Sequence, residues 1–297
     1  MNEIKYWIWL SRIKGIGSKN INKLLNKYKT PENIWRLNEK ELTKINGIGE
    51  IIAKNILNID YRKNLDKYEG YMLKNNIKLI SINDEKYPKK LKEIYDPPIC
   101  IYVKGNEKIL NDFAISIIGC RNCSKYGENI SKKLAFSLSN NNINVISGLA
   151  RGIDTYAHKG CININNLNVE KGKTIAVVGN GLDIIYPKEN IEIFNNIIYS
   201  GGAIVSEYII GTKPFKMNFP ARNRIISGLS DGVIVVEATE KSGTMITVDF
   251  ALEHGKNVFA IPGNIDSKNS EGTNRLIKEG AKLVTNINDI LSEYNHI

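Results

Sequence analysis

Two arginines, Arg222 and Arg224, stand two residues apart in the segment FPARNRIISGLS (219–230). The chain has 41 lysines and arginines, and only eight of them are arginine, so the pair is unusual for this composition. Arginine can grip a phosphate with two hydrogen bonds from its planar guanidinium, which lysine cannot do. The pair therefore indicates a phosphate-rich ligand. The alternative is a buried ion pair, for example with Glu237 or Asp231.

Further candidate groups follow short apolar runs that are rich in β-branched residues. Arg121 comes directly after the run AISIIG, and Arg151 lies in the loop SGLARGID (147–154) after another run. Residues 242–244, Ser-Gly-Thr, open a predicted helix, where free amides and hydroxyls can hold an anion. Small residues are frequent in these loops, because close approach of the backbone to a ligand leaves no room for a side chain. We expect the four arginines and these loops to form one cleft.

The elements that must position these loops follow from the hydrophobic pattern after residue 76. Continuous apolar runs are typical of strands that are buried on both faces of a parallel sheet, and helical patterns separate most of them. The alternation predicts a doubly wound α/β domain, in which ligands bind beyond the carboxyl ends of the strands. Residues 162–171 are polar and predict a loop. The expected strands are IKLISI, ICIYVKG, AISIIGC, INVISG, TIAVVGN, AIVSEY, GVIVVEA, NVFAIPG and AKLVT.

The N-terminal part has a different pattern. Residues 12–28 and 42–58 each contain Gly-Ile-Gly followed by a helical apolar pattern, and the two copies are offset by 32 residues. This pattern is typical of a helix-hairpin-helix, whose glycines permit a tight turn and whose amides can meet a phosphate. A small helical packing or partner-binding module without DNA contact is the alternative. We place a helical domain at 1–66 and the α/β domain at 67–297.

Charge and composition add weaker constraints. The net charge is +10, and residues 1–65 carry 13 basic and 6 acidic side chains, so most of the excess lies in the helical domain. An acidic partner such as nucleic acid fits this balance. No apolar run is long enough to span a membrane, and the N-terminus lacks the features of a signal peptide. We therefore expect a cytoplasmic protein without a membrane partner.

Motifs for catalysis or metal binding are incomplete. GNGLD (179–183) is a fragment of GxGxxG with Ile184 at the third glycine, and no P-loop motif is present. Cys120 and Cys123 form a single CxxC without further paired ligands, which leaves a redox pair or two reduced thiols. His158 follows Asp154 by four residues, a spacing that is more typical of a local helix contact than of catalysis. We expect no catalytic residue, no cofactor and no metal.

Several segments together resemble the DNA-processing protein A (DprA, also called Smf) family. They occur in the family's order over roughly 115–285, and residues 77–106 resemble the family's lead-in to its sheet domain. The resemblance implies an extended Rossmann-like domain, with a SAM-like helical domain before it and without the C-terminal winged-helix domain of many members. The matching segments are SGLARGIDTYAH, GNGLDIIYPKEN, GGAIVSEY, FPARNRIISGLS, VVEATEKSGTMITVDFALEHGKNVFAIPG and EGTNRLIKEGA.

The resemblance also implies a function and a set of binding residues. Members bind single-stranded DNA, protect incoming DNA during natural transformation, load the RecA recombinase onto it, act as homodimers and are not known to need catalysis. Cys120 stands where the family usually has serine. The family's motifs carry DNA binding onto Gly119, Arg121, Ser147, Gly148, Arg151, Gly152, Lys188, Arg222, Asn223, Arg224, Lys241, Ser242, Gly243 and Thr244.

Two other functions are compatible with the residues. A Rossmann-like nucleotide or nucleoside-phosphate hydrolase would use a similar glycine-rich geometry to bind a mononucleotide. An adaptor would bind DNA through its basic N-terminal module and protein through its sheet domain. Phe215, Phe219 and Tyr208 are candidates for stacking on bases near the arginine pair, which single-strand binders commonly use.

Overall fold

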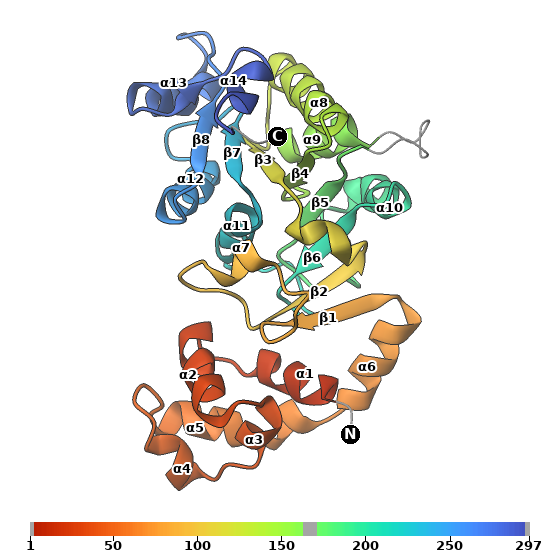
Figure 1. The fold of residues 1–297 in the computed structure, drawn as a ribbon, viewed down its shortest axis with the longest axis vertical. Coiled ribbons are helices and arrows are strands. Elements are labelled where there is room, and N and C mark those ends of the chain that lie inside the picture. The colour runs from red at the N-terminus through yellow and green to blue at the C-terminus, as the bar shows by residue number, and fades with distance from the viewer. Residues whose placement is uncertain (1–2, 163–170, 295–297) are drawn as a thin grey trace.

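A computed structural model describes residues 3–162 and 171–294, so the polar loop expected at 162–171 lies almost wholly outside the described residues. The chain forms a helical N-terminal module followed by an α/β domain (Figure 1). None of the helices within the described ranges is long and apolar enough to cross a bilayer. The N-terminal module contains α1 (Ile4–Arg12), α2 (Ser18–Tyr28), α3 (Pro31–Trp35), α4 (Glu39–Thr43), α5 (Glu50–Leu57) and the 3-10 helix η1 (Ile59–Arg62).

The two hairpins of this module have the conformation that their glycines predict. Gly15 and Gly47 have φ values of 79° and 95°, which favour glycine, and α2 and α5 begin three residues after them. The hairpins also contact each other in equivalent ways. Asn55 Nδ2 donates to the carbonyl of Lys14 at 3.0 Å, and Lys23 Nζ, which is 32 residues earlier than Asn55, donates to the carbonyl of Asn46 at 3.3 Å. The module is therefore a tandem helix-hairpin-helix with internal pseudo-symmetry.

A sheet of nine strands forms the centre of the α/β domain, in the order β1-β2-β6-β5-β4-β3-β7-β8-β9. The seven strands from β6 to β9 in this order are parallel, and β1 and β2 extend the sheet antiparallel. All nine expected strands are present. They are β1 (Ile77–Ser81), β2 (Cys100–Gly105), β3 (Ala114–Ile118), β4 (Asn144–Ser147), β5 (Thr174–Val177), β6 (Ala203–Ser206), β7 (Gly232–Val235), β8 (Asn257–Ala260) and β9 (Lys282–Leu283).

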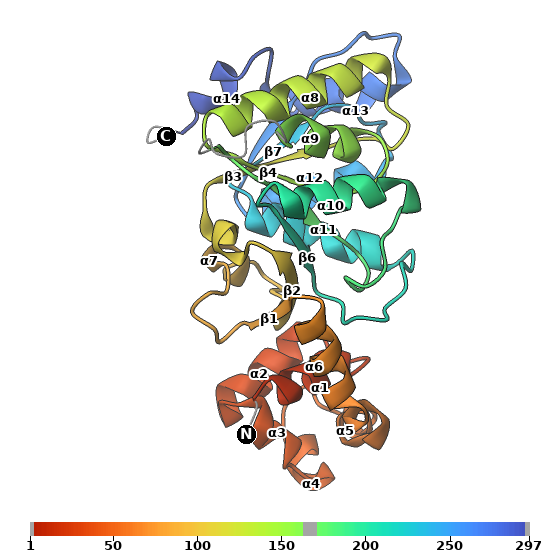
Figure 2. The ribbon, with the colours of Figure 1, turned by 90° about the vertical axis from the view of Figure 1, so that its right-hand side faces the viewer.

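Helices cover both faces of the sheet, so the predicted doubly wound, Rossmann-like fold is confirmed (Figures 1 and 2). One face carries α8 (Lys125–Asn140), α9 (Ile153–Cys161) and α10 (Ile191–Tyr199), and the other carries α11 (Asn218–Leu229) and α12 (Gly243–Glu253). The strand order reverses between β3 and β7, which is the point where ligands bind in such folds. The remaining helices are α6 (Leu65–Lys74), α7 (Lys89–Lys92), α13 (Glu271–Lys278), α14 (Asn288–Leu291) and the 3-10 helices η2 (Glu107–Asn111), η4 (Lys188–Asn190) and η5 (Lys268–Ser270).

The helical module packs at the β1 end of the sheet, away from β7 (Figure 2). Buried side chains of the module, such as Trp9, and of the sheet, such as Val103, belong to one continuous hydrophobic cluster. Helix α6 (Leu65–Lys74) runs across the boundary that we placed after residue 66 and contacts both α1 and β1. Ser11 Oγ also lies 2.8 Å from the hydroxyl of Tyr102. The two parts of the chain are therefore joined by shared packing.

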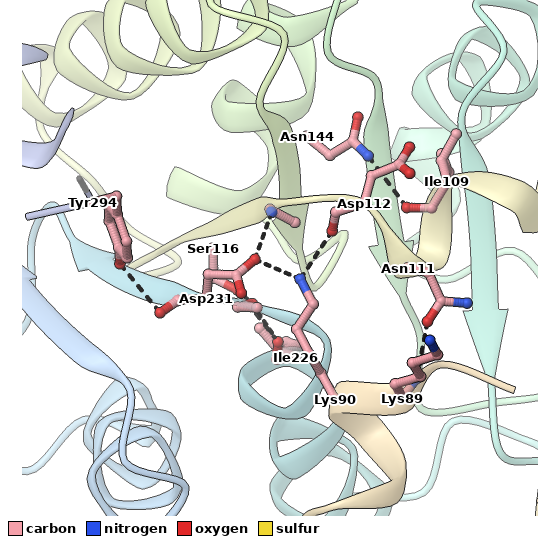
Figure 3. Close-up of polar contacts among 12 residues, drawn as sticks. Lys89, Lys90, Ile109, Asn111, Asp112, Ser116, Asn144, Ile226, Asp231 and Tyr294 are labelled. Atoms are coloured by element: carbon pink, nitrogen blue, oxygen red, sulfur yellow. Dashed lines mark hydrogen bonds and ion pairs between the residues drawn. The ribbon is translucent and has the colours of Figure 1, made fainter. Parts of the chain in front are cut away.

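The lead-in segment is fixed to the main sheet by a half-buried ion pair (Figure 3). Lys90 of α7 donates to the carboxylate of Asp231, at the start of β7, and to the carbonyl of Asp112 at 2.9 Å. The same Asp231 carboxylate accepts the amide of Ala114 at 2.9 Å, and its carbonyl accepts the hydroxyl of Tyr294 at 3.1 Å. The expectation that Asp231 could pair with an arginine of α11 is wrong, because Lys90 occupies it.

Candidate nucleic-acid interface

A cleft of about 670 Å³ opens at the switch point between β3 and β7. Its walls come from the loop after β3, the loop after β4, the first turns of α11 and the first turns of α12. Because the carboxyl ends of parallel strands share one edge of the sheet, loops that are far apart in the sequence meet here. The predicted site residues that line the cleft are Gly119, Arg121, Arg222, Asn223, Ser242, Gly243 and Thr244.

Arg121 is an exposed cation of the cleft. Its side chain is exposed, and it makes no hydrogen bond or ion pair with another described residue. Its guanidinium lies 5.6 Å from the centroid of the Phe219 ring, and that ring is in turn 5.7 Å from the ring of Tyr186. A cation over an aromatic face is held in place while its hydrogen-bond donors stay available. Arg121 is therefore free to bind a phosphate beside two rings on which a base can stack.

The N-terminus of α12 offers an open anion site at the opposite wall. Ser242 caps the helix in extended conformation without a side-chain cap bond, and its buried Oγ has no partner among the described residues. Gly243 is exposed, and a Cβ at this position would meet no atom within 4 Å. The first amides of a helix have no intrahelical acceptor and carry the positive end of the helix dipole. An anion can therefore approach this backbone closely.

The N-terminus of α8, on the other side of the switch point, is already occupied. The buried carboxylate of Glu237 accepts the amide of Ser124 at 2.8 Å and also its hydroxyl. A Cβ at Gly127 would lie 2.5 Å from this carboxylate, so the helix start closes tightly around it. An internal anion thus fills the position that a phosphate takes at the first βα turn of nucleotide-binding Rossmann folds.

Arg222 forms the positive floor of the cleft. It is 4% exposed, and its Nη1 donates to the carbonyl of Gly148 at 2.6 Å and to that of Val177, which ties together the ends of β4 and β5. Its Nε has no partner among the described residues. Burial lowers the pKa of Arg222 to about 10, so the side chain stays charged at neutral pH. Arg222 therefore both holds the strand ends in place and adds positive charge beneath the cleft.

The expectation that Arg224 joins the same cleft is wrong. Its guanidinium donates to both carboxylate oxygens of Glu207, at 2.7 and 2.6 Å, and to the carbonyl of Asp96 at 2.9 Å. Burial by itself lowers the pKa of Arg224, but the hydrogen bonds that it donates to Glu207 raise the pKa above its usual value. The physical reason is the helical period: residues two apart on a helix point in nearly opposite directions. The buried ion pair proposed as the alternative therefore holds for Arg224, although its partner is neither Glu237 nor Asp231.

Arg151 and two lysines lie outside the main cleft. Arg151 is exposed in an adjoining small pocket and forms an ion pair with Glu189. Lys188 and Lys241 are exposed and do not belong to the lining of the cleft. None of these three cations lines the main cleft.

The small predicted residues shape the loops. Ser147 is buried and donates its hydroxyl to the carbonyl of Ile117 at 2.7 Å, so it is a packing residue. Gly148 lies against Arg222, where a Cβ would come within 2.6 Å of the guanidinium. Gly152 has a φ of 74°, and its Cβ would lie 2.3 Å from the carbonyl oxygen of Cys120. Glycines at these positions let the loops after β3 and β4 touch.

Three contributors were missed in the sequence. Lys216 lines the cleft but is one of many lysines, so composition hid it. Tyr186 lines the cleft opposite Phe219. Asn190 is buried and donates to the carbonyl of Leu149 at 2.9 Å, which holds the loop that carries Arg151. Tyr186 and Asn190 both lie in the segment YPKEN (186–190), which matches the family. That match pointed to Lys188 and could have pointed to these two residues as well.

The described residues offer little for catalysis at this site. Asp154 is the only carboxylate among the described residues that line the cleft, and burial raises its pKa. His158 is fully buried, contacts Thr174 Oγ1 at 2.7 Å, and burial lowers its pKa to about 3. Burial, together with Glu237, raises the pKa of Cys120 to about 12, which disfavours a reactive thiolate. Within the described ranges, no group of three or more His, Cys, Asp or Glu could hold a metal ion.

Comparison with known proteins places this fold and site. Residues 78–295 match the family model of DNA recombination-mediator protein A, and residues 10–58 match that of the SAM-like helix-hairpin-helix tandem. The chain is 46% identical to DNA processing protein DprA of Streptococcus pneumoniae over 214 residues, covering 72% of this chain and 73% of that protein. It is 36% identical to Protein Smf of Synechocystis over 303 residues, covering all of this chain and 74% of that protein.

Solved structures agree. The X-ray structure of DNA processing protein A from S. pneumoniae superposes with a TM-score of 0.78 at 37% identity and covers 99% of both chains. A Helicobacter pylori structure, described as showing the single-stranded DNA binding mode of DNA processing protein A, superposes with a TM-score of 0.65 at 32% identity, covering 74% of this chain and 97% of that one. The family predicted from the motifs is confirmed, and this chain belongs to the DNA recombination-mediator protein A (DprA/Smf) family.

Proposed function

We propose that the protein binds single-stranded DNA through the cleft at the switch point, without catalysis. The observation that carries the proposal is the pairing of a free guanidinium, Arg121, with the open N-terminus of α12 across one cleft. Each group binds a phosphate without reading a base, and the rings of Tyr186 and Phe219 line the same cleft, where bases can stack on them. A relative from H. pylori is described as binding single-stranded DNA.

The cleft suits a polymer better than a mononucleotide. A hydrolase would need an acid–base pair of accessible groups, and Asp154 is a single carboxylate buried beside Arg222. Glu237 also fills the anion position of the first βα turn. The cleft in turn has two phosphate-binding walls and a continuation toward Arg151. These features favour a run of several phosphates over one nucleotide and support the single-strand binder over the hydrolase.

We extend the proposal to the cellular role that the family resemblance implies. The protein would protect incoming DNA during natural transformation and load RecA recombinase onto it, acting as a homodimer in the cytoplasm. Two clefts on one assembly would raise the avidity for a long strand, because the second cleft binds intramolecularly. The partner proteins are proposed from the resemblance alone. A pull-down of purified RecA in the presence and absence of oligo-dT tests the RecA contact, and sedimentation of the protein alone tests the homodimer. A negative result in either experiment overturns the corresponding claim.

Substitution of Arg121 tests the DNA-binding proposal. Arg121→Ala should weaken binding of labelled oligo-dT by about tenfold, because one charge-assisted phosphate contact is lost. It should also lower the slope of log K against log salt by about one, because one fewer counterion is released. The side chain is exposed and makes no polar contact with other described residues, so the fold should be unaffected. Fluorescence anisotropy at four salt concentrations measures both quantities.

Arg36→Ala is the matched control. It removes the same charge from an exposed site on the helical module, where Glu32 is the one described residue that pairs with Arg36. We expect this variant to bind oligo-dT almost as the wild type does. Equal losses in the two variants would mean that binding follows net charge and would overturn the cleft as the site. A loss confined to Arg36→Ala would favour the adaptor function instead.

A further inference from the structure

The helix α11 presents two different sides to the molecule. Phe219, Arg222 and Asn223 line the cleft. Arg224 points instead into a separate pocket of about 240 Å³ between the helical module and the sheet domain. One short helix thus borders both the proposed DNA site and the junction of the two parts of the chain.

Arg224 lies at the centre of this junction. It is 8% exposed, and it binds three separate segments: Glu207 after β6, the carbonyl and carboxylate of Asp96 in the lead-in loop, and the carbonyl of Ala221 in its own helix. The bidentate contact with Glu207 fixes the plane of the guanidinium, and the contacts with Asp96 fix its free edge. Rotation or shift of α11 would break several of these bonds together.

Asp96 continues the contacts into the helical module. Its carboxylate accepts the hydroxyl of Ser18, the first residue of α2, which directly follows the first Gly-Ile-Gly hairpin. Beside it, Lys19 Nζ donates to the hydroxyl of Tyr95 at 3.0 Å. A continuous series of polar contacts therefore runs from Ser18 through Asp96 to Arg224 on α11.

We propose that Arg224 is a positioning residue, which couples the docking of the helical module to DNA binding without touching DNA. The inference rests on the proposed function of the cleft. When the module is docked through Ser18 and Asp96, Arg224 holds α11 in the orientation that places Phe219 and Asn223 in the cleft. When these contacts are lost, α11 gains freedom, and ordering it again upon binding costs affinity.

Three substitutions in the full chain test the coupling. Arg224→Gln should weaken oligo-dT binding by about tenfold, because it breaks several bonds of a buried charge. Arg224→Lys should restore little, because an ammonium cannot form the planar bidentate contact. Asp96→Asn should weaken binding by about two- to threefold. The Asp96 side chain is 47% exposed, so this variant should fold even if the changes at Arg224 are not tolerated.

The salt dependence separates positioning from phosphate contact. For all three variants we expect the slope of log K against log salt to equal that of the wild type, since no phosphate contact is lost. A slope reduced by about one in Arg224→Gln would make Arg224 a DNA ligand and overturn the inference. Wild-type affinity in Asp96→Asn would likewise overturn the coupling.

A mutant cycle tests the path from the module. The double variant Ser18→Ala with Arg224→Gln should lose no more affinity than Arg224→Gln alone, because both changes interrupt one series of contacts. Additive losses would mean that the two residues act independently and would overturn the inference. Arg121→Ala is measured in parallel. If Arg121→Ala leaves oligo-dT affinity unchanged, the cleft is not the DNA site. If Arg121→Ala lowers the affinity as expected but the changes at Arg224 and Asp96 have no effect, only the coupling is overturned.

Discussion

Two helices begin on either side of the switch point, and they treat negative charge in opposite ways. The start of α8 is closed by the carboxylate of Glu237, which satisfies the amide and hydroxyl of Ser124. The start of α12 has no side-chain cap, and Gly243 is open to the cleft. The same backbone feature therefore serves the fold at one helix and is available to a ligand at the other. What distinguishes them is whether the protein supplies its own anion.

The largest expected effect comes from making α12 resemble α8. Gly243→Asp places a carboxylate at the open helix start, where a Cβ has space, so the fold should be kept. Repulsion of the DNA phosphates should weaken oligo-dT binding by roughly a hundredfold, since like charges in an interface cost several kcal/mol. Gly243→Asn is the neutral control and should lose much less. Anisotropy titrations that give equal affinities for the two variants would contradict an anion site at α12.

Removing the carboxylate at the start of α8 should lower the stability of the fold and leave DNA binding almost unchanged. Glu237→Ala leaves the amide and hydroxyl of Ser124 without their acceptor in a buried site, which should lower the free energy of unfolding by about 3 kcal/mol. Urea denaturation measures this loss. Oligo-dT affinity at a temperature where the variant is folded should change by less than about threefold. A large loss of affinity with unchanged stability would reverse the roles that we assign to the two helix starts.

A smaller effect reports on the buried charge beneath the cleft. Burial, with Arg222 nearby, lowers the pKa of His158 to about 3. The unfolded chain binds a proton at this histidine near pH 6.5 and the folded chain does not, so His158 makes stability fall as the pH decreases below 6.5. Between pH 7 and pH 5 this contribution amounts to about 2 kcal/mol.

The His158→Gln variant isolates that contribution from those of other titrating groups, such as Asp154, whose pKa is raised by burial. Urea denaturation of both proteins at pH 7 and pH 5 should show a loss that is about 2 kcal/mol smaller in the variant. Identical losses in the two proteins would show that His158 takes up its proton in the folded state, and that the floor of the cleft is less positive or more open than described.

Much of the fold could be predicted because the signals are local. Runs such as AISIIG and GVIVV are apolar on both faces, and the buried strands β3 and β7 confirm this. Gly15 and Gly47 occupy positions with positive φ, which the paired Gly-Ile-Gly pattern indicated. The antiparallel addition of β1 and β2 was not specified, because pairing direction depends on connections that the apolar pattern does not encode.

The candidate site was harder to predict because charge alone does not tell where a side chain points. Arg121 lies in the loop that follows β3, and this position at a strand end was sufficient to predict that it lines the cleft. Arg222 and Arg224 lie on one helix, and counting residues without the helical period grouped them wrongly. Lys216 was missed because lysine is abundant in this chain, so composition carried no signal for it. Glu237 was considered as an arginine partner, but its role required knowing which helix start lies beside it.

Hydrogen–deuterium exchange of the full chain, with and without saturating oligo-dT, compares the two helix starts in a single experiment. If α12 supplies the phosphate site, the amides of Gly243 and Thr244 should become protected when DNA is bound, because they gain acceptors. Those of residues 125–128, at the start of α8, should keep their exchange rates. Protection at α8 with none at α12 would contradict the account.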